Sequence, residues 1–517
     1  MIKAFSLSIN FSHNMRLFLL ILFIGCINNP SNNDETAVVF DNSSSWLIRI
    51  NDYYCSFDQG NKTMLFPIGS VNINGFNGII EYPEEHYDNI YLNDIMVGNG
   101  ENFNFGNINV DDTIRVIFKI DAKDVVYNLL FTTLPTVLIF TSENIMDDPK
   151  ISSRLIINDL FGDQVYDAFA GIETRGGTSQ TFPKVSYDIE LWEDENGLDT
   201  RKEELFGLRN DEDWHLDAMY IDLSKSRNIL GMETWSSFAR ANHLLIEENA
   251  QLSQGGCLVE VFHNNNYLGV YSMNEQIDRK QLGLKKNGGL LYKSDAWNIE
   301  NIYEGIEVEP DSSLFWSGFE LKHPEDLNVA NWLHLYDLVN LVAYSTDETF
   351  TDRIEEIVDM ENIIDYFLFI NLIQANDNSG KNMFICRYDE GYPLSFVPWD
   401  LDLTFGNKNS IYTIDDPDDI ILTNNLFDRL FELNVNGYRT KVNLRWNAIY
   451  HNNIFEDIIN DLTTNINNLI DSNAGYRDNI RWALEIDHNE KLEYIKTWLE
   501  VRLMFFDNYI NTNYLIE

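Results

Sequence analysis

The stretch NDNSGKNMFICRYDEGYPLSFVPWDLDLTFG, residues 376–406, contains the order of elements that decides the fold. A cluster of loop-forming residues, 376–380, is followed by two apolar runs, Met383–Tyr388 and Pro393–Val397, on either side of a Gly-containing turn. This arrangement predicts a β-hairpin. The preceding residues, Glu361–Ala375, are apolar around much of a helical circumference, which predicts a buried helix. The predicted order is therefore helix, acidic loop, hairpin, acidic loop.

The two acidic loops of this stretch are expected to lie side by side. A strand that leaves and a strand that returns place their outer ends next to each other, so Asp377 and Asp400 become neighbours. Asn382 follows Asp377 by five residues. Protein kinases use that offset between the Asp that accepts the substrate's proton and an Asn that holds Mg²⁺, and an Asp beyond a hairpin holds Mg²⁺ as well. The spacing of these three residues therefore favours phosphoryl transfer.

A second block of sequence suits phosphate binding. Residues 171–179 run into a Gly-Gly turn rich in hydroxyl groups, and Lys184 begins the next strand-like run. Glycine lets backbone N–H groups approach an anion closely, and a lysine at this place can reach a phosphate. An ordinary hairpin turn followed by a surface lysine would give the same pattern, so this block alone leaves both interpretations open.

Together the motifs resemble the CotH (spore coat protein H) kinase family. The resemblance extends from about residue 134 to the C-terminus and is carried by Asn376-Asp377, Lys381-Asn382, Pro398-Trp399-Asp400-Leu401-Asp402, Phe405-Gly406 and the block at 171–184. It implies an α+β fold with an atypical protein-kinase-like bilobal domain at residues 134–517. Residues 36–133 are short β-rich runs punctuated by Asn, Asp and Gly, which predict a small all-β sandwich domain before it.

The resemblance also implies a role for each matching residue. Asp377 and Lys184 would be catalytic, Asp377 as the base that orients the substrate hydroxyl. Asn382 and Asp400 would bind Mg²⁺ or Mn²⁺, and Asp402 would either ligate the metal or hold its loop. The phosphates of ATP would be held by Arg175, Gly176, Gly177, Thr178, Ser179, Lys184 and Lys381.

Residues 1–26 are predicted to be a bacterial lipoprotein signal peptide. A basic residue precedes the apolar run 17–24, and Gly25 precedes Cys26. The run is too short for a permanent transmembrane helix, while a basic start and a small residue before the cut suit an export signal. We expect a lipid anchor on Cys26, a tether at 27–35 and a location in the bacterial cell envelope, periplasmic or surface-exposed. The alternative is an ordinary apolar N-terminus.

The charge of the chain limits its partners. Eighty-two Asp and Glu against 36 Lys and Arg give a formal charge of -46, which repels nucleic acid and favours basic partners. The four cysteines lie far apart, which argues against a disulfide framework. The sequence has no His-x-x-x-His pair to support a zinc hydrolase. The oligomeric state is left open.

These observations predict an atypical protein kinase that transfers phosphate from ATP to Ser, Thr or Tyr hydroxyls of a protein, with a basic substrate favoured. In ordinary kinases a helical Glu pairs with the phosphate-binding Lys, and Glu233 and Glu275 are both candidates here. The alternative function is a cell-surface binding or adhesion protein on a catalytically weak or inactive scaffold, because an exported protein meets little ATP. A glycosidase that uses Asp400 and Asp402 ranks last, since acids this close on one loop do not flank a sugar bond.

Overall fold

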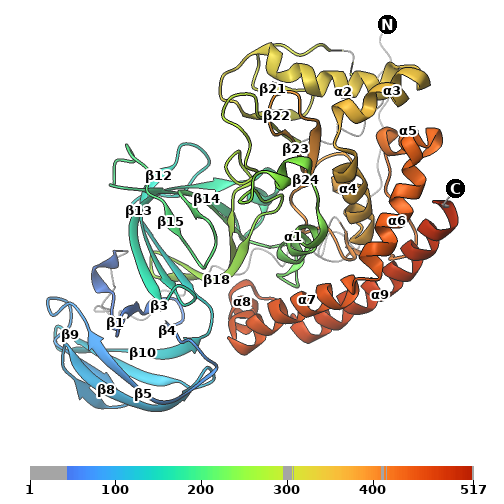
Figure 1. The fold of residues 1–517 in the computed structure, drawn as a ribbon. Coiled ribbons are helices and arrows are strands. Elements are labelled where there is room, and N and C mark those ends of the chain that lie inside the picture. Colours follow the sequence, from blue (N-terminus) through green and yellow to red (C-terminus); the bar gives the residue numbers. More distant parts are fainter. Residues whose placement is uncertain (1–42, 295–304, 307, 409–412, 415, 515–517) are drawn as a thin grey trace, which may run out of the picture. The chain divides into compact units, whose positions relative to one another are not determined.

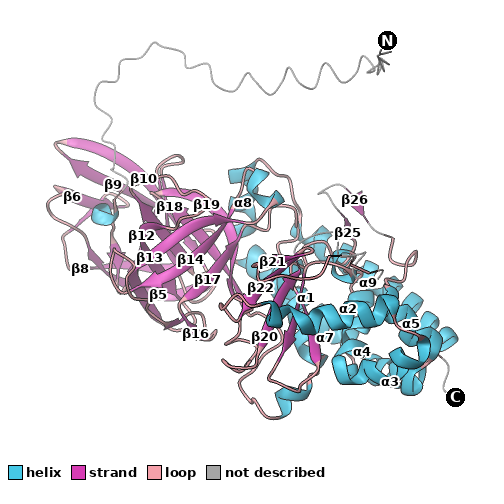
Figure 2. Ribbon diagram, turned by 90° about the horizontal axis from the view of Figure 1, so that it is seen from above, coloured by secondary structure: helices cyan, strands magenta, loops and turns pink. Residues whose placement is uncertain are grey.

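The computed structural model describes residues 43–294, 305–306, 308–408, 413–414 and 416–514 (Figure 1). The predicted signal peptide with Cys26 and the predicted tether lie outside these residues. Within the described ranges, no helix combines the length and the apolar character needed to cross a membrane. Figure 2 shows the helices gathered apart from most of the strands, so the predicted α+β class is confirmed.

The strands up to Thr132 form two sheets, with the orders β2-β1-β5-β8 and β3-β4-β10-β9-β6-β7. The sheets contact each other through Phe66 of β4 and Phe76 of β5, whose ring centroids are 6.1 Å apart. Every second residue of β9 is buried, the alternation expected of a strand with one face on a core. This is the predicted N-terminal all-β region. Its strands are β1 (Arg49–Ile50), β2 (Tyr53–Tyr54), β3 (Ser56–Asp58), β4 (Thr63–Pro67), β5 (Asn72–Glu81), β6 (Asn89–Leu92), β7 (Ile95–Val97), β8 (Glu101–Asn109), β9 (Ile114–Ile120) and β10 (Lys123–Thr132).

A closed barrel follows, with the strand order β11-β12-β13-β14-β17-β19-β18. It closes where β11 runs parallel to β18, with Thr136 opposite Glu260. Its interior is filled by apolar side chains that include Trp214 and Tyr271. The barrel occupies the segment where the family resemblance predicts a small lobe, and the bilobal arrangement stays a prediction. The strands here are β11 (Thr136–Thr141), β12 (Ile151–Asp159), β13 (Gln164–Arg175), β14 (Ser186–Trp192), β17 (Asp213–Asp217), β18 (Gly256–His263) and β19 (Asn266–Glu275), with the small pair β15 (Glu203–Glu204) and β16 (Asn210–Asp211).

The third part of the fold packs a sheet, in the order β21-β22-β20-β23-β24, and a set of helices around one large apolar core. The strands are β20 (Leu290–Ser294), β21 (Phe315–Trp316), β22 (Phe319–His323), β23 (Met383–Arg387) and β24 (Leu394–Pro398), with the separate pair β25 (Asn407–Lys408) and β26 (Thr413–Ile414). The helices are α1 (Arg227–Phe238), which precedes the sheet, α2 (Leu333–Tyr344), α3 (Asp347–Ile357), α4 (Met360–Leu372), α5 (Asn425–Leu433), α6 (Tyr438–Tyr450), α7 (Ile454–Asp471), α8 (Ala474–Trp482) and α9 (His488–Asn513).

The predicted order of helix, loop, hairpin and loop is confirmed. All of α4 except Glu361 is buried, which is why its sequence is apolar on nearly every face. A single 3₁₀ turn, η7 (Asp377–Ser379), connects α4 to β23, and β23 pairs antiparallel with β24. Because Met383 lies opposite Pro398, the two loops that flank the hairpin meet at one end of the sheet.

Candidate active site

The two acidic loops meet at the side chain of Asn382. Its Nδ2 lies 3.4 Å from Oδ2 of Asp377 and 3.3 Å from Oδ2 of Asp400, so one amide donates to both carboxylates. Asp377 and Asn382 are buried, each 7% exposed. The structure therefore brings together the three residues that the hairpin geometry places side by side, while their roles stay predictions.

Hydrogen bonds to backbone carbonyl groups hold the two loops against each other. Trp399 N donates to Asn382 O over 2.9 Å. The buried amide of Asn378 donates to the carbonyl oxygens of both Asn382 and Trp399. Asn378 is a residue that sequence reasoning passed over, because its contact lies across the hairpin. Its side chain therefore joins the loop before β23 to the loop after β24.

Several non-glycine residues of this region adopt left-handed backbone conformations. The φ angles are 52° at Asn382, 59° at Asp400 and 48° at Phe405. Asn and Asp tolerate this region, whereas a bulky residue such as Phe405 pays about 1 kcal/mol or more for it. Phe405 is fully buried and its N–H donates to Ile373 O, so packing and a hydrogen bond hold the strained turn in place.

Negative charge is concentrated around the second loop. Burial, and then the charge of Asp217, raise the pKa of Asp400 to about 6, although Arg175 opposes the shift. The pKa of Asp402 is raised well above its usual range by burial and by the charges of Asp400 and Asp217. Asp217 ends β17 in the barrel, and no sequence signal marks it, because only the packing of the barrel on this loop brings it close.

The side chain of Asp402 is half-buried, and its backbone carbonyl accepts a hydrogen bond from Asn407 Nδ2. Carboxylate and amide oxygens are the donor set that Mg²⁺ and Mn²⁺ prefer. Rotating the Asn382 amide by half a turn would present its oxygen instead of its nitrogen. The residues present thus fit a divalent cation held by Asn382, Asp400 and Asp402.

Positively charged side chains surround the loop on its other sides. Lys381 Nζ lies 3.0 Å from Oδ2 of Asp377. The ring of Trp399 is contacted by two cations, with Lys293 Nζ 4.2 Å and the Arg175 guanidinium carbon 5.9 Å from its centroid. These contacts bring the end of β13 close to the acidic loops. Lys293, on β20, was not among the predicted phosphate ligands.

The predicted phosphate turn follows Arg175 directly. Gly176, Gly177 and Thr178 are exposed, and Thr178 begins a short 3₁₀ turn, η3 (Thr178–Thr181). Gly176 has a φ of 93°, and a Cβ there would lie 2.0 Å from Oγ of Ser179, so only glycine fits. The exposed backbone of this turn is free to approach a ligand, as the sequence predicts for a phosphate-binding loop.

Lys184 is fully buried and has a partner that the sequence did not suggest. Its Nζ lies 3.0 Å from Oδ1 of Asp478 on α8 and also donates to Val270 O. Neither predicted glutamate pairs with it. Glu233 accepts from Asn465 Nδ2, and Glu275 accepts from the N–H groups of Arg209 and Gly255. The expectation of a glutamate partner was wrong, because helix α8 packs on β19 and provides an aspartate instead.

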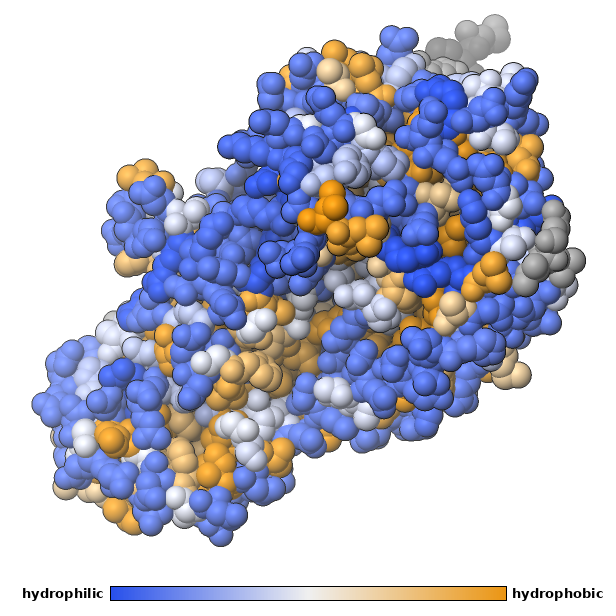
Figure 3. Space-filling view, in the orientation of Figure 1, coloured by the Kyte–Doolittle hydropathy of each residue, from blue (hydrophilic) through white to orange (hydrophobic). Residues whose placement is uncertain are grey.

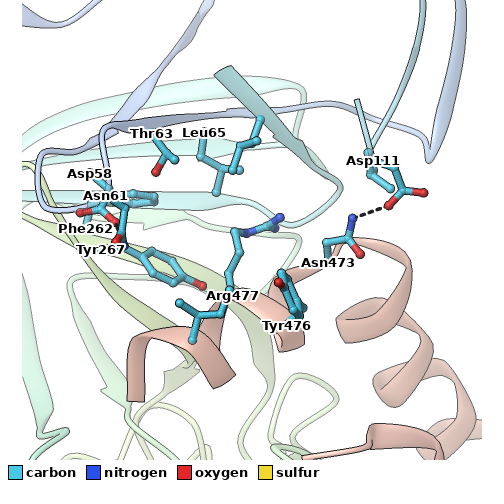
Figure 4. A pocket seen from close by; sticks show the side chains of 13 residues that line it. Asp58, Asn61, Thr63, Leu65, Asp111, Phe262, Tyr267, Asn473, Tyr476 and Arg477 are labelled. Carbon is cyan, nitrogen blue, oxygen red and sulfur yellow. Dashed lines mark hydrogen bonds between the residues drawn. The ribbon is translucent and has the colours of Figure 1, made fainter. Parts of the chain in front are cut away.

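Two other features lie away from these loops. A cavity of about 490 Å³ opens between β-sandwich strands, the barrel and α8, and Figure 4 shows Arg477 and Tyr476 on its helical wall. The carboxylates of Asp211, Glu212 and Asp213 lie within 4.8 Å of one another, but Arg209, Lys202 and Lys280 form ion pairs with this group. Neither the cavity nor this group of carboxylates contains a residue of the two acidic loops.

Comparisons with known proteins identify the family to which the sequence is similar. The sequence model of the CotH kinase protein family matches residues 172–506, more than half of the chain and a range that includes every predicted catalytic and ligand-binding residue from Arg175 to Asp402. The inner spore coat protein H of Bacillus subtilis (strain 168) is 24% identical over 237 residues, which are 46% of this chain and 58% of that protein. The alignment thus covers less than two thirds of the relative. The chain belongs to the CotH kinase protein family.

Proposed function

We propose that the protein transfers the γ-phosphoryl group of ATP to Ser, Thr or Tyr hydroxyls of a protein in a reaction that requires Mg²⁺ or Mn²⁺. The observation that carries the proposal is the amide of Asn382, which lies within 3.4 Å of both Asp377 and Asp400. This proximity supports a reaction in which Asp377 accepts a proton beside oxygen ligands from Asn382 and Asp400, as phosphoryl transfer requires. Membership of a kinase-like family supports the same reaction.

Each residue then has a defined task. The substrate hydroxyl oxygen bonds to the γ-phosphorus, the bond from that phosphorus to the ADP oxygen breaks, and Asp377 takes the hydroxyl proton. Asn382, Asp400 and Asp402 would hold the cation, which when bound neutralises phosphate charge. Lys184, Lys381 and the turn at 175–179 would bind phosphate oxygens through ammonium groups and through backbone N–H groups.

Labelled ATP tests the proposal. The purified protein is incubated with [γ-³²P]ATP, MgCl₂ or MnCl₂, and a Lys- and Arg-rich acceptor protein. We expect label transfer in the parent protein and a loss of at least about a hundredfold in Asp377→Asn and in Asp400→Asn, because each removes one essential function. Asp337→Asn is the control, since Asp337 forms an exposed ion pair with Arg353 on the surface.

A separate measurement of ATP binding distinguishes the role of Asp377 from that of Asp400. Asp377→Asn should still bind Mg²⁺ and ATP, whereas Asp400→Asn should lose the Mg²⁺ dependence of ATP binding. A parent protein that neither transfers label nor binds ATP would refute the proposal and leave a binding or adhesion role on an inactive scaffold.

We also propose that the protein resides in the bacterial cell envelope through a lipid on Cys26. The export-like segment before Cys26 supports this, and the relative's name places that relative in a spore coat. Cells grown with labelled palmitate should incorporate label into the parent protein and not into Cys26→Ser. Equal labelling of both proteins would exclude lipidation at Cys26.

A further inference from the structure

Helix α8 places a buried carboxylate against strand β19 of the barrel. Asp478 is 2% exposed, and its Oδ1 accepts hydrogen bonds from Lys184 Nζ at 3.0 Å and from Val270 N at 2.9 Å. Lys225 Nζ lies 3.8 Å from its Oδ2. Lys184 and Lys225 are 1% and 2% exposed, so water cannot replace Asp478 as their partner.

Strand β19 of the barrel leaves room for the carboxylate of Asp478. Gly269 has a φ of 111°, and a Cβ at this position would lie 2.3 Å from Oδ1 of Asp478. The next turn of α8 is tied to the same strand, because Arg481 Nε donates to Tyr267 O and Trp482 Nε1 donates to Leu268 O. The position of Asp478 is therefore determined by contacts along β19 and not only by its bond to Lys184.

We propose that Asp478 is the positioning residue of the phosphate-binding lysine, which it holds in place and in its charged form from the C-terminal helical layer. The inference rests on the proposed function. In ordinary kinases a glutamate on a helix of the small lobe performs this task. Here Glu233 and Glu275 have other partners, and an aspartate 294 residues beyond Lys184 takes their place.

The charges around Lys184 support this assignment. The groups that face it are Asp478 from α8, Lys225 from the turn before α1, Asp217 from β17 and the ring of Tyr271 from β19, 4.6 Å from its Nζ. Burial lowers the pKa of Lys184 to about 8, and Asp478 is the strongest of the charges that oppose this shift. Asp217 also acts on the carboxyl groups of Asp400 and Asp402, which connects Lys184 electrostatically to the acidic loops.

The test compares the parent protein with Asp478→Asn, Asp478→Glu and a control, Tyr476→Ala, all as full-length chains. Tyr476 lies on the same helix and is 67% exposed at the cavity shown in Figure 4, so its loss leaves the pair intact. The KM for MgATP and kcat are measured from pH 6.5 to 8.5. The pH at which Lys184 loses its proton is read from an NMR titration of protein labelled with ¹³C at lysine Cε, in which the signal absent from Lys184→Arg identifies Lys184.

In Asp478→Asn we expect the KM for MgATP to rise at least tenfold at pH 8, with kcat less affected. At pH 6.5 the increase should be smaller, because Lys184 regains its proton there. The Lys184 titration midpoint should move to lower pH in Asp478→Asn and stay near that of the parent in Asp478→Glu, which keeps the charge. Tyr476→Ala should match the parent in every measurement.

An equal loss at pH 6.5 and pH 8 with an unchanged titration midpoint would overturn the assignment and leave Asp478 a structural residue. Should Asp478→Asn not fold, Asp478→Glu decides: a parent-like midpoint with a raised KM supports positioning, and a shifted midpoint overturns it. Failure of the kinase proposal is recognised separately, because the parent would then transfer no phosphate while the titration midpoints of Lys184 would still report the pair.

Discussion

Asp400 combines three features that disfavour the folded state. Its backbone is left-handed, its carboxyl group is close to Asp217 and Asp377, and burial opposes its ionisation. Unfavourable backbone geometry and burial of this kind are retained when many surrounding contacts fix the residue and when function requires it. The hydrogen bonds of Asn378 and Asn382 fix Asp400 in place, because they join the loops on either side of the hairpin.

The stability of the protein should therefore depend on pH through Asp400. Its folded-state pKa of about 6 lies above the ordinary 3.8, so its favourable contribution is complete below about pH 4 and is lost as pH rises through about 6. In EDTA at pH 7.5, Asp400→Asn should be more stable than the parent by roughly 1 to 3 kcal/mol. Thermal unfolding midpoints at pH 5, 6 and 7.5 measure the difference.

Addition of MgCl₂ is the control for this prediction. The cation should raise the unfolding midpoint of the parent at pH 7.5 and leave that of Asp400→Asn nearly unchanged, because the variant lacks one oxygen ligand. A variant that is less stable than the parent in EDTA would show that Asp400 serves the fold and not a cation.

At the scale of elements, α4 supports the acidic loops because its middle and its C-terminal end are tied to other segments of the chain. Near its middle, the fully buried Asp365 binds Arg240 at 2.8 Å and Arg445 at 2.7 Å. At its C-terminal end, Arg502 of α9 donates to Asn371 O over 2.7 Å. The loop with Asp377 follows a few residues later, so its position depends on this anchoring.

Replacement of Asp365 should show how much this anchoring contributes. Asp365→Ala leaves two guanidinium groups without their shared carboxylate and should lower the free energy of unfolding by roughly 3 kcal/mol. The matched control is Asp337→Ala, whose pair with Arg353 is 46% and 44% exposed and is worth less than about 1 kcal/mol. Denaturant unfolding followed by tryptophan fluorescence measures both. Similar losses in the two variants would contradict a specific role for Asp365.

At the scale of the whole molecule, charge dominates the surface. The chain carries a formal charge of -46, and Figure 3 shows hydrophilic residues over most of the visible face, with apolar residues in small groups. A field of this sign attracts basic proteins and weakens as salt is added, because the screening length falls to about 10 Å at 0.1 M salt. The acidic surface therefore bears on the choice of substrate more than on the chemistry at the acidic loops.

The salt dependence of the reaction follows from this charge. For a Lys- and Arg-rich acceptor protein, the KM should rise several-fold between 50 and 300 mM NaCl while kcat changes little. For an acceptor of neutral composition, the KM should change much less over the same range. Phosphorylation rates measured with both acceptors check this, and an equal response of the two would argue against electrostatic selection.

Local pattern was enough to predict the helix at 360–372, the hairpin at 383–398 and the meeting of Asp377, Asn382 and Asp400, since periodicity, turn residues and hairpin geometry act over short distances in the chain. The N-terminal all-β region was predictable for the same reason. Tertiary structure alone decided the closure of the barrel, the approach of Asp217 to Asp400 and the pairing of Lys184 with Asp478. These depend on how elements far apart in sequence pack together, and packing of this kind leaves no periodic signal in the residues that take part.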